Sequence, residues 1–82
     1  NKIMMLSMYA VKDELNGFTT PIPFPNDEIA KRYLLDQVKE NPTIKNSPKD
    51  FSIWHIGEFD TKAGCMVPGG NELIERAENY GK

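Results

Sequence analysis

The sequence predicts a small α+β domain, in which a three-stranded, mostly antiparallel sheet carries one long helix on a face in the order β-α-β-β. Three observations predict this fold. In residues 3–12, both the odd-numbered and the even-numbered positions are mostly apolar. Residues 27–40 carry an apolar stripe at helical spacing, and residues 51–67 contain two strand-like runs around a turn that includes a glycine. We expect residues 1–67 to form this single domain and residues 68–82 to form a tail or a short helix.

The apolar run at residues 3–12 predicts a strand that is covered on both faces. A strand with one solvent-exposed face would alternate apolar and polar residues, and this run does not. Its methionines, which include Met4 and Met8, are adaptable side chains that suit a contact surface. We therefore expect the helix on one face and the second subunit of a homodimer on the other.

Prolines at every second position predict that residues 21–25 are extended, because proline fixes φ and has no backbone donor. Such a segment is not a central strand. Phe24, between two of these prolines, either packs against the domain or docks a partner. We favour packing, and we keep partner binding by Phe24, Met4 and Met8 as the alternative.

A helix is predicted from Asn26 or Asp27, either of which can cap it, to the Asn41-Pro42 pair, because the residue before proline resists helical geometry. Residues 42–50 are polar and punctuated by prolines, which indicates a loop. Residues 51–59 then form a strand, residues 60–64 a turn and residues 65–67 the returning strand. A short helix over residues 72–80 is possible.

The composition limits the functions that the chain can have. Its formal net charge is -2 and its pI is about 5.3, so it lacks the basic excess that is typical of proteins that coat nucleic acid. One cysteine excludes an internal disulfide. The apolar N-terminal run is too short to span a membrane. We expect a cytoplasmic protein with no membrane association.

No arrangement of residues predicts catalysis, a metal site or a cofactor. His55 is the single histidine, and its spacing from Cys65 matches neither a zinc motif nor a nucleophilic set with an acid. Glu58 and Asp60 lie two apart at a strand end, where a turn-forming role for Asp60 is the simpler interpretation. We therefore expect that the protein is not an enzyme.

An aromatic strand near basic residues suggests single-stranded DNA as a ligand. Binding of single strands combines base stacking on aromatic rings with phosphate contacts. Trp54 lies in the strand at residues 51–59, and four lysines lie in the loops and strand ends around it: Lys12, Lys45, Lys49 and Lys62. In the alternative, which we favour for Trp54, this ring belongs to the core or a dimer contact and the lysines are ordinary solvated charges.

The order of elements, with prolines at 21, 23 and 25, resembles the small nonstructural protein of gokushovirus-type microviruses, and so does one motif: Pro48-x-Asp50-Phe51-x-Ile53-x-x-Ile56-Gly57-Glu58-Phe59-Asp60-x-x-x-Gly64. The likeness covers residues 3–67. It implies a phage protein of the host cytoplasm, associated with replication of a single-stranded DNA genome and described in this family as DNA-binding. It implies no catalytic residue.

Two function hypotheses follow. In the first, a homodimer binds single-stranded DNA and assists genome replication or the switch to packaging, without catalysis. In the second, the chain is an adaptor that binds a host or viral replication protein and has no affinity for nucleic acid. The acidic charge favours the adaptor, and the family resemblance favours DNA binding.

Overall fold

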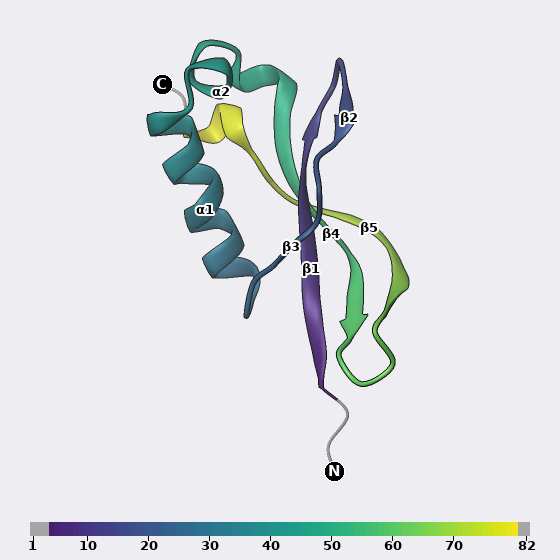
Figure 1. Cartoon of the computed structure of the whole chain (residues 1–82). Coiled ribbons are helices and arrows are strands. Elements are labelled where there is room, and N and C mark those ends of the chain that lie inside the picture. Colours follow the sequence, from purple (N-terminus) through teal and green to yellow (C-terminus); the bar gives the residue numbers. More distant parts are fainter. Residues whose placement is uncertain (1–3, 81–82) are drawn as a thin grey trace.

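The computed structural model describes residues 4–80 (Figure 1). The strands are β1 (Met5–Asp13), β2 (Gly17–Phe18), β3 (Ile22–Pro23), β4 (Phe51–Asp60) and β5 (Cys65–Arg76). The helices are α1 (Asp27–Glu40) and α2 (Pro42–Asn46), with short 3-10 turns η1 (Pro48–Asp50) and η2 (Ala77–Asn79). The molecule is elongated, with extents of 46 × 22 × 18 Å, because β1, β4 and β5 extend past the region that α1 covers (Figure 1).

The predicted three-stranded sheet with one long helix is wrong, because the strands form one five-stranded antiparallel sheet. Its order is β2-β1-β4-β5, and β3 also pairs with β1. One extra strand, β2, follows the turn at Asn16-Gly17. The other, β3, comes from the proline-rich segment, in which Ile22 pairs with Tyr9 and the Phe24 N–H donates to the Ser7 carbonyl at 3.1 Å. An edge strand needs a donor only at alternate residues, so prolines between those donors do not prevent pairing.

The C-terminal segment is also a strand where a short helix was expected. β5 continues from Cys65 to Arg76, and Leu73 pairs with Trp54 of β4. A helix of so few apolar residues would be marginal in water. Pairing with β4 satisfies the same backbone groups and leads to η2, where Ala77 is fully buried. Residues 68–76 are therefore part of the sheet.

The turn that the sequence predicted between these strands is confirmed. Asp60 Oδ1 accepts from the backbone N–H groups of Lys62 and Ala63, at 2.9 and 3.0 Å. Gly64 closes the turn with φ of +73°, a conformation that side chains disfavour. Asp60 therefore has the turn-forming role that its position suggested.

Strand β1 is buried on both faces within a single chain. Met8, Tyr9, Ala10 and Val11 are four consecutive buried residues. The register between β1 and β4 shifts after Met8, where the partner changes from Gly57 to His55, and such an irregularity increases the bend and twist of a sheet. The burial that suggested a second subunit is thus supplied by the curled sheet and α1.

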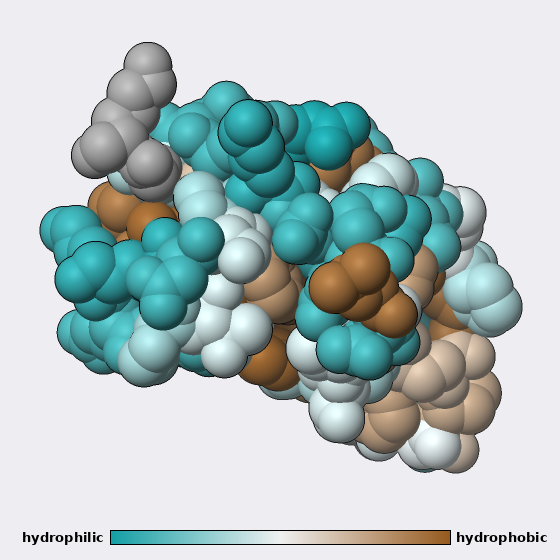
Figure 2. Space-filling view, turned by 90° about the horizontal axis from the view of Figure 1, so that it is seen from above, coloured by the Kyte–Doolittle hydropathy of each residue, from teal (hydrophilic) through white to brown (hydrophobic). Residues whose placement is uncertain are grey.

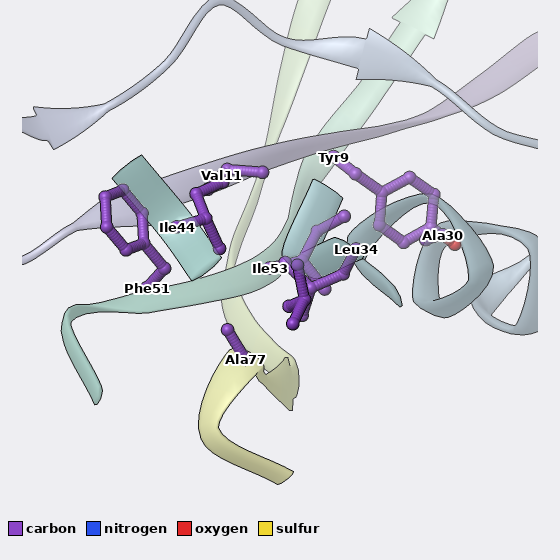
Figure 3. Packing of buried hydrophobic residues seen from close by; sticks show 9 residues of the cluster. Tyr9, Val11, Ala30, Leu34, Ile44, Phe51, Ile53 and Ala77 are labelled. Atoms are coloured by element: carbon purple, nitrogen blue, oxygen red, sulfur yellow. The ribbon is translucent and has the colours of Figure 1, made fainter. Parts of the chain in front are cut away.

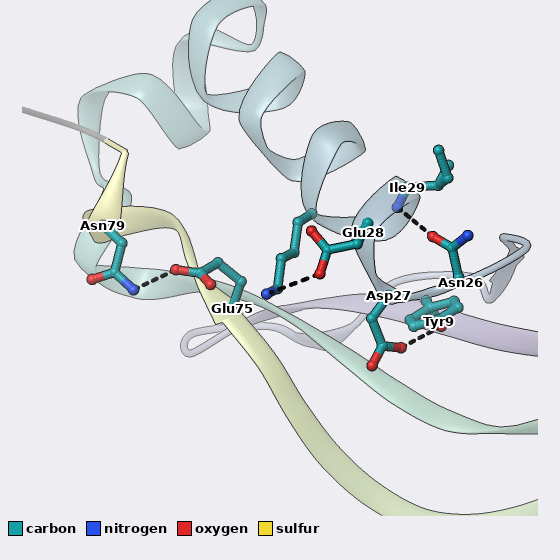
Figure 4. A network of polar contacts seen from close by, with 8 residues as sticks. Tyr9, Asn26, Asp27, Glu28, Ile29, Glu75 and Asn79 are labelled. Carbon is teal, nitrogen blue, oxygen red and sulfur yellow. Dashed lines mark hydrogen bonds and ion pairs between the residues drawn. The ribbon is translucent and has the colours of Figure 1, made fainter.

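Helix α1 confirms the prediction made for it. Asn26 is the N-cap, and its side-chain oxygen accepts from the Ile29 N–H at 2.9 Å (Figure 4). The helix buries Ala30, Leu34 and Val38 and ends one residue before Asn41. The same asparagine then caps α2 by accepting from the Thr43 N–H at 3.0 Å. The predicted loop at residues 42–50 is therefore wrong, because Asn41-Pro42 also starts a helix.

The hydrophobic core lies between α1 and the adjacent half of the sheet (Figure 3). Leu34 of α1 is fully buried, and Tyr9 and Ile53 from the neighbouring strands β1 and β4 are 1% exposed. Ile44 of α2 and Ala77 of η2 close the cluster at one end. We call the end of the molecule that contains α2 and η2 the helix end. The opposite end, around the β4–β5 turn, is the hairpin end.

Candidate nucleic-acid interface

Three side chains from three strands meet on the face of the sheet opposite α1. Lys12 of β1 pairs with Phe18 of β2. Ala10, two residues before Lys12 and therefore on the same face of β1, pairs with Trp54 of β4. Successive strand residues point to opposite faces. Because Tyr9 and Val11 point into the core with α1, Lys12 and its partners point the other way. We call Lys12, Phe18 and Trp54 the Lys12 cluster.

In the Lys12 cluster a cation lies beside two rings, and the three groups form a nearly equilateral triangle. The ammonium nitrogen of Lys12 lies 5.6 Å from the centroid of Trp54 and 5.8 Å from that of Phe18. The two rings meet edge to face, with centroids 6.1 Å apart and planes at 82°. Both distances are within the range of cation–π attraction. The Trp54 indole N–H also donates to Ser52 Oγ at 2.8 Å, which fixes the ring.

The cluster is accessible to a ligand. Phe18 is 43% exposed, the Lys12 side chain is 33% exposed, and Trp54 is half-buried. Glu14 lies near it, with Oε2 3.8 Å from Lys12 Nζ. This carboxylate partly neutralises Lys12 and competes with any phosphate for the ammonium group.

Two further lysines lie at the helix end and one does not. Lys49 belongs to η1, which is held beside the β1–β2 turn by the Glu14 N–H donating to the Asp50 carbonyl at 2.9 Å. Lys45 lies on α2 and is exposed, as is Lys49. Lys62 lies in the β4–β5 turn at the hairpin end (Figure 1). The structure therefore brings Lys12 and Trp54 together and separates Lys62 from them.

The surface at the helix end is largely polar. Figure 2 looks onto the molecule from above and shows hydrophilic residues over much of this surface, with hydrophobic residues in separate patches. Leu15, at the tip of the β1–β2 turn, is 82% exposed. An end of this kind favours contacts with a solvated, charged ligand more than burial against an apolar surface.

The three residues proposed to bind a partner have different environments. Met4 is 58% exposed, and its carbonyl accepts from the Thr61 N–H at 3.0 Å. Met8 is 8% exposed and belongs to the buried residues. Phe24 packs between Tyr9 and Tyr33, with ring centroids 5.8 and 5.1 Å away.

A shallow hollow and several apolar side chains mark the surface beside the start of β1. The hollow has a volume of about 360 Å³ and is lined by Met5, Leu6, Ser7 and residues 23–25. At the hairpin end, Met5, Met66 and Val67 are 40%, 41% and 41% exposed. Leu6 pairs with Phe59 and Phe59 pairs with Met66, so strand alternation places Met4 and Met66 on one face of the sheet and Met5 and Val67 on the other. We call Met4 and Met66, on their shared face, the methionine surface.

Phe18 is the residue of the Lys12 cluster that sequence reasoning missed. The signal was present, because Asn16-Gly17 is a dipeptide that favours tight hairpin turns. Gly17 has φ of +92°, and the chain reverses there so that β2 pairs with the end of β1. A hairpin predicted at this dipeptide would have placed Phe18 opposite Lys12.

The polar residues on the α1 side of the sheet fix the fold. The Tyr9 hydroxyl donates to Asp27 Oδ1 at 2.6 Å and so ties β1 to the start of α1 (Figure 4). Burial and the neighbouring Asp27 carboxylate raise the pKa of Tyr9. His55 Nε2 lies 3.6 Å from Glu58 Oε2. Among residues 4–80, no group of three histidine, cysteine or acidic side chains is arranged to hold a metal ion.

Comparison with known proteins gives one finding. A family model with the description "Phage ORF5 protein" matches residues 6–80, which is nearly the whole chain. No curated protein and no solved structure gives a significant match. Within the part of the chain that the structure describes, no helix has the length and apolar character needed to cross a membrane.

Proposed function

The chain belongs to the Phage ORF5 protein family, and on this premise we propose that it binds single-stranded DNA as a homodimer. In this role it assists replication of a single-stranded DNA genome, of the gokushovirus-type microviruses, or the switch to packaging. It acts by occupying the strand in the cytoplasm of the host, without catalysing a reaction.

The observation that carries this proposal is the Lys12 cluster. An exposed phenylalanine and a half-buried tryptophan, with a lysine beside both rings, offer a nucleotide both a stacking surface and a cation. Stacking of one base on an aromatic side chain contributes roughly 1–3 kcal/mol. Because every base has an aromatic face, such a surface suits a ligand of any sequence.

The acidic net charge is compatible with this proposal because three of the proposed lysines lie on elements of the helix end. Lys12 lies on β1 and faces away from α1, while Lys45 lies on α2 and Lys49 on η1. Few phosphate contacts predict modest affinity and a shallow dependence on salt, since the slope grows with the number of phosphates neutralised. The protein would therefore bind single strands reversibly.

Fluorescence anisotropy of a labelled single-stranded oligonucleotide, titrated at low and physiological salt, tests the proposal. Lys12→Glu should weaken binding at low salt by tenfold or more, on the order of 1.4 kcal/mol. Lys62→Glu is the matched control, because it makes the same charge change at the hairpin end. Equal losses in the two variants would show a nonspecific charge effect and would exclude the Lys12 cluster as the site.

The homodimer part of the proposal is assigned to the methionine surface. Flexible thioether side chains fill irregular contacts well, and a two-fold dimer buries one patch against its own copy. Met66→Glu places a charge in this surface and should convert the dimer to a monomer in analytical ultracentrifugation. A wild-type chain that sediments as a monomer at high micromolar concentration would exclude this dimer.

The adaptor function remains the second candidate, and the hollow beside Phe24 favours it. The hollow lies where the proline-rich segment leaves the edge of β1, and an extended peptide can add to such an edge. This candidate predicts no oligonucleotide binding at any salt concentration. It also predicts that Met5→Glu, at the rim of the hollow, abolishes capture of a phage or host replication protein.

A further inference from the structure

A second hollow lies at the helix end, on the face of the sheet that α1 covers. It has a volume of about 480 Å³ and lies between the β1–β2 hairpin, the C-terminal half of α1, and α2. Small-molecule sites commonly have volumes of about 300–1,000 Å³. The hollow contributes nothing to the Lys12 cluster, which is on the opposite face of the sheet.

One wall of this hollow offers hydrogen-bond donors. Asn41 Nδ2 donates to Gln37 Oε1 at 3.3 Å, and Asn41 Oδ1 accepts from the Thr43 N–H. The first bond orients the Gln37 amide and leaves its NH₂ group without a partner among residues 4–80. A half-buried amide held by a neighbour is a preorganised donor pair.

The facing wall offers an acceptor. Asp13, at the end of β1, accepts from the Leu15 N–H at 2.9 Å and from Asn16 Nδ2 at 3.0 Å. Each carboxylate oxygen has a second lone pair that remains available. The negative charge of Asp13 disfavours a phosphate in this hollow and favours a neutral ligand that donates hydrogen bonds.

The floor of the hollow is apolar and partly aromatic. Tyr33 and Phe51 line it together with Val11 and Ile44. Phe51 and Ile44 belong to the buried cluster, and Tyr33 packs against it. Rigid side chains of this kind suit a flat ligand whose faces are apolar and whose edges are polar.

From this arrangement we infer that the hollow binds an unstacked nucleobase that carries an exocyclic amine, as adenine, cytosine and guanine do and thymine does not. The amine donates to Asp13, while a ring nitrogen or carbonyl of the same base accepts from the Gln37 amide. Amide side chains recognise adenine in this way, and carboxylates recognise the amine of cytosine. Thymine has no exocyclic amine and can offer Asp13 only its ring N3–H, which two carbonyl oxygens flank, so it is disfavoured.

The inference rests on the proposed function, because the hollow and the Lys12 cluster lie on either side of the same hairpin. Asp13 and Thr19 line the hollow, and each is next in sequence to a member of the cluster, Lys12 or Phe18. Adjacent strand residues point to opposite faces. A single strand that stacks on Phe18 and Trp54 can therefore pass around β2 and place a following base in the hollow.

The test uses free nucleosides, which have no phosphate and so do not depend on the lysines. Deoxyadenosine, deoxycytidine and thymidine are titrated separately into ¹⁵N-labelled full-length protein, and chemical shifts are followed by NMR. We expect the two amine-bearing nucleosides to shift the Gln37 side-chain amide and the Thr43 backbone amide. The affinity for thymidine should be lower by a factor of roughly five or more, as expected for loss of one directed pair.

Two variants separate recognition from folding. Gln37→Leu removes the donors and should abolish the shifts, with Asp36→Asn on the exposed side of α1 as the control. Asp13→Asn keeps a turn-forming acceptor but can also donate, so it should shift the preference toward thymidine. A structural role alone would not reverse the order of nucleosides.

The outcomes distinguish this inference from the proposed function. Nucleoside shifts that persist in Lys12→Glu, while that variant loses oligonucleotide binding, support both. Oligonucleotide binding without nucleoside shifts at Gln37 overturns the base site and leaves the Lys12 cluster intact. Nucleoside shifts without oligonucleotide binding overturn the proposed function alone. Equal binding of all three nucleosides overturns the assigned preference.

Discussion

The helix end and the hairpin end share strands β4 and β5 and differ in what covers them. At the helix end, Phe51 and Ile53 of β4 are buried in the core beneath α1, and Ser52 between them is buried on the opposite face, where it accepts from the Trp54 indole. At the hairpin end, every residue of β5 from Cys65 to Glu72 is exposed. The same two strands therefore supply the stability of the fold at one end and an open surface at the other.

Substitutions at the two ends should differ most in their effect on stability. Leu34→Ala removes a fully buried side chain and should lower the free energy of unfolding by about 2–5 kcal/mol. Met66→Ala, at a residue that is 41% exposed, should change it by about 0.5 kcal/mol or less at concentrations where the chain is monomeric. Urea denaturation measures both, and similar losses would remove the distinction between the ends.

Gly57 lies where the two ends meet, and its substitution should have the next largest effect. A Cβ at this position would meet the Val67 carbonyl oxygen, and φ of +153° is a conformation that L side chains rarely adopt. Gly57→Ala should therefore cost about 2 kcal/mol or more. Gly64→Ala is the matched control, because φ is +73° there but no atom lies within 4 Å of the added Cβ. Equal losses would show that contact with β5 is unimportant.

The Tyr9–Asp27 hydrogen bond should stabilise the helix end by a smaller amount. Tyr9→Phe removes the hydroxyl that donates to Asp27 and should cost about 1–2 kcal/mol, as for a bond to a charged acceptor. Thermal unfolding at neutral pH measures the loss. An unchanged melting temperature would mean that this bond does not help to hold α1 on the sheet.

The pH dependence of the free energy of unfolding tests separately how Tyr9 and Tyr80 stabilise the helix end. Burial, with the Asp27 carboxylate for Tyr9 and Glu75 for Tyr80, raises the pKa of both phenols. The folded state then holds these protons more tightly, so their contribution is complete below about pH 10, the ordinary pKa of tyrosine, and is lost as pH rises through the raised values. Stability should fall above pH 10, less steeply in Tyr9→Phe. A parallel fall in both proteins would contradict the role assigned to Tyr9.

The smallest expected effect concerns DNA binding. Glu14→Gln removes the carboxylate that lies 3.8 Å from Lys12 Nζ and should raise affinity for single-stranded DNA by about two- to threefold at low salt, in keeping with the weakness of exposed pairs. The gain should disappear at high salt. Anisotropy titrations measure it, and reduced affinity would show that Glu14 supports the cluster instead of competing with the ligand.

The sequence predicted the elements whose signals are local. The cap at Asn26 and the stop at Asn41-Pro42 marked α1 correctly, and Gly64 marked the β4–β5 turn. The prolines of residues 21–25 correctly predicted an extended segment that is not a central strand. That this segment pairs with β1 could not be predicted, because it depends on which residues direct donors toward β1. The strand conformation of residues 68–76 depends on pairing with β4. The periodicity of the sequence does not indicate such a long-range contact.

The candidate site was predicted in part for the same reason. Lys12 and Trp54 were selected from residue type and from their positions in or beside predicted strands, and the pairing of β1 with β4 brings them together. Phe18 was missed because it required recognition of the hairpin at Asn16-Gly17. The hollow that contains Asp13 and Gln37 could not be predicted, since it is formed by elements that meet only after the helix packs on the sheet.

The central claim is that a base stacks at the Lys12 cluster, and Trp54 fluorescence tests it most directly because this residue is the single tryptophan of the chain. Titration with an unlabelled single-stranded oligonucleotide at low salt should quench the emission, with a midpoint that matches the anisotropy titration. Phe18→Ala should weaken this binding by roughly fivefold or more, the loss expected for one stacking contact. Binding detected by anisotropy with Trp54 emission unchanged would contradict the claim and place the DNA elsewhere on the molecule.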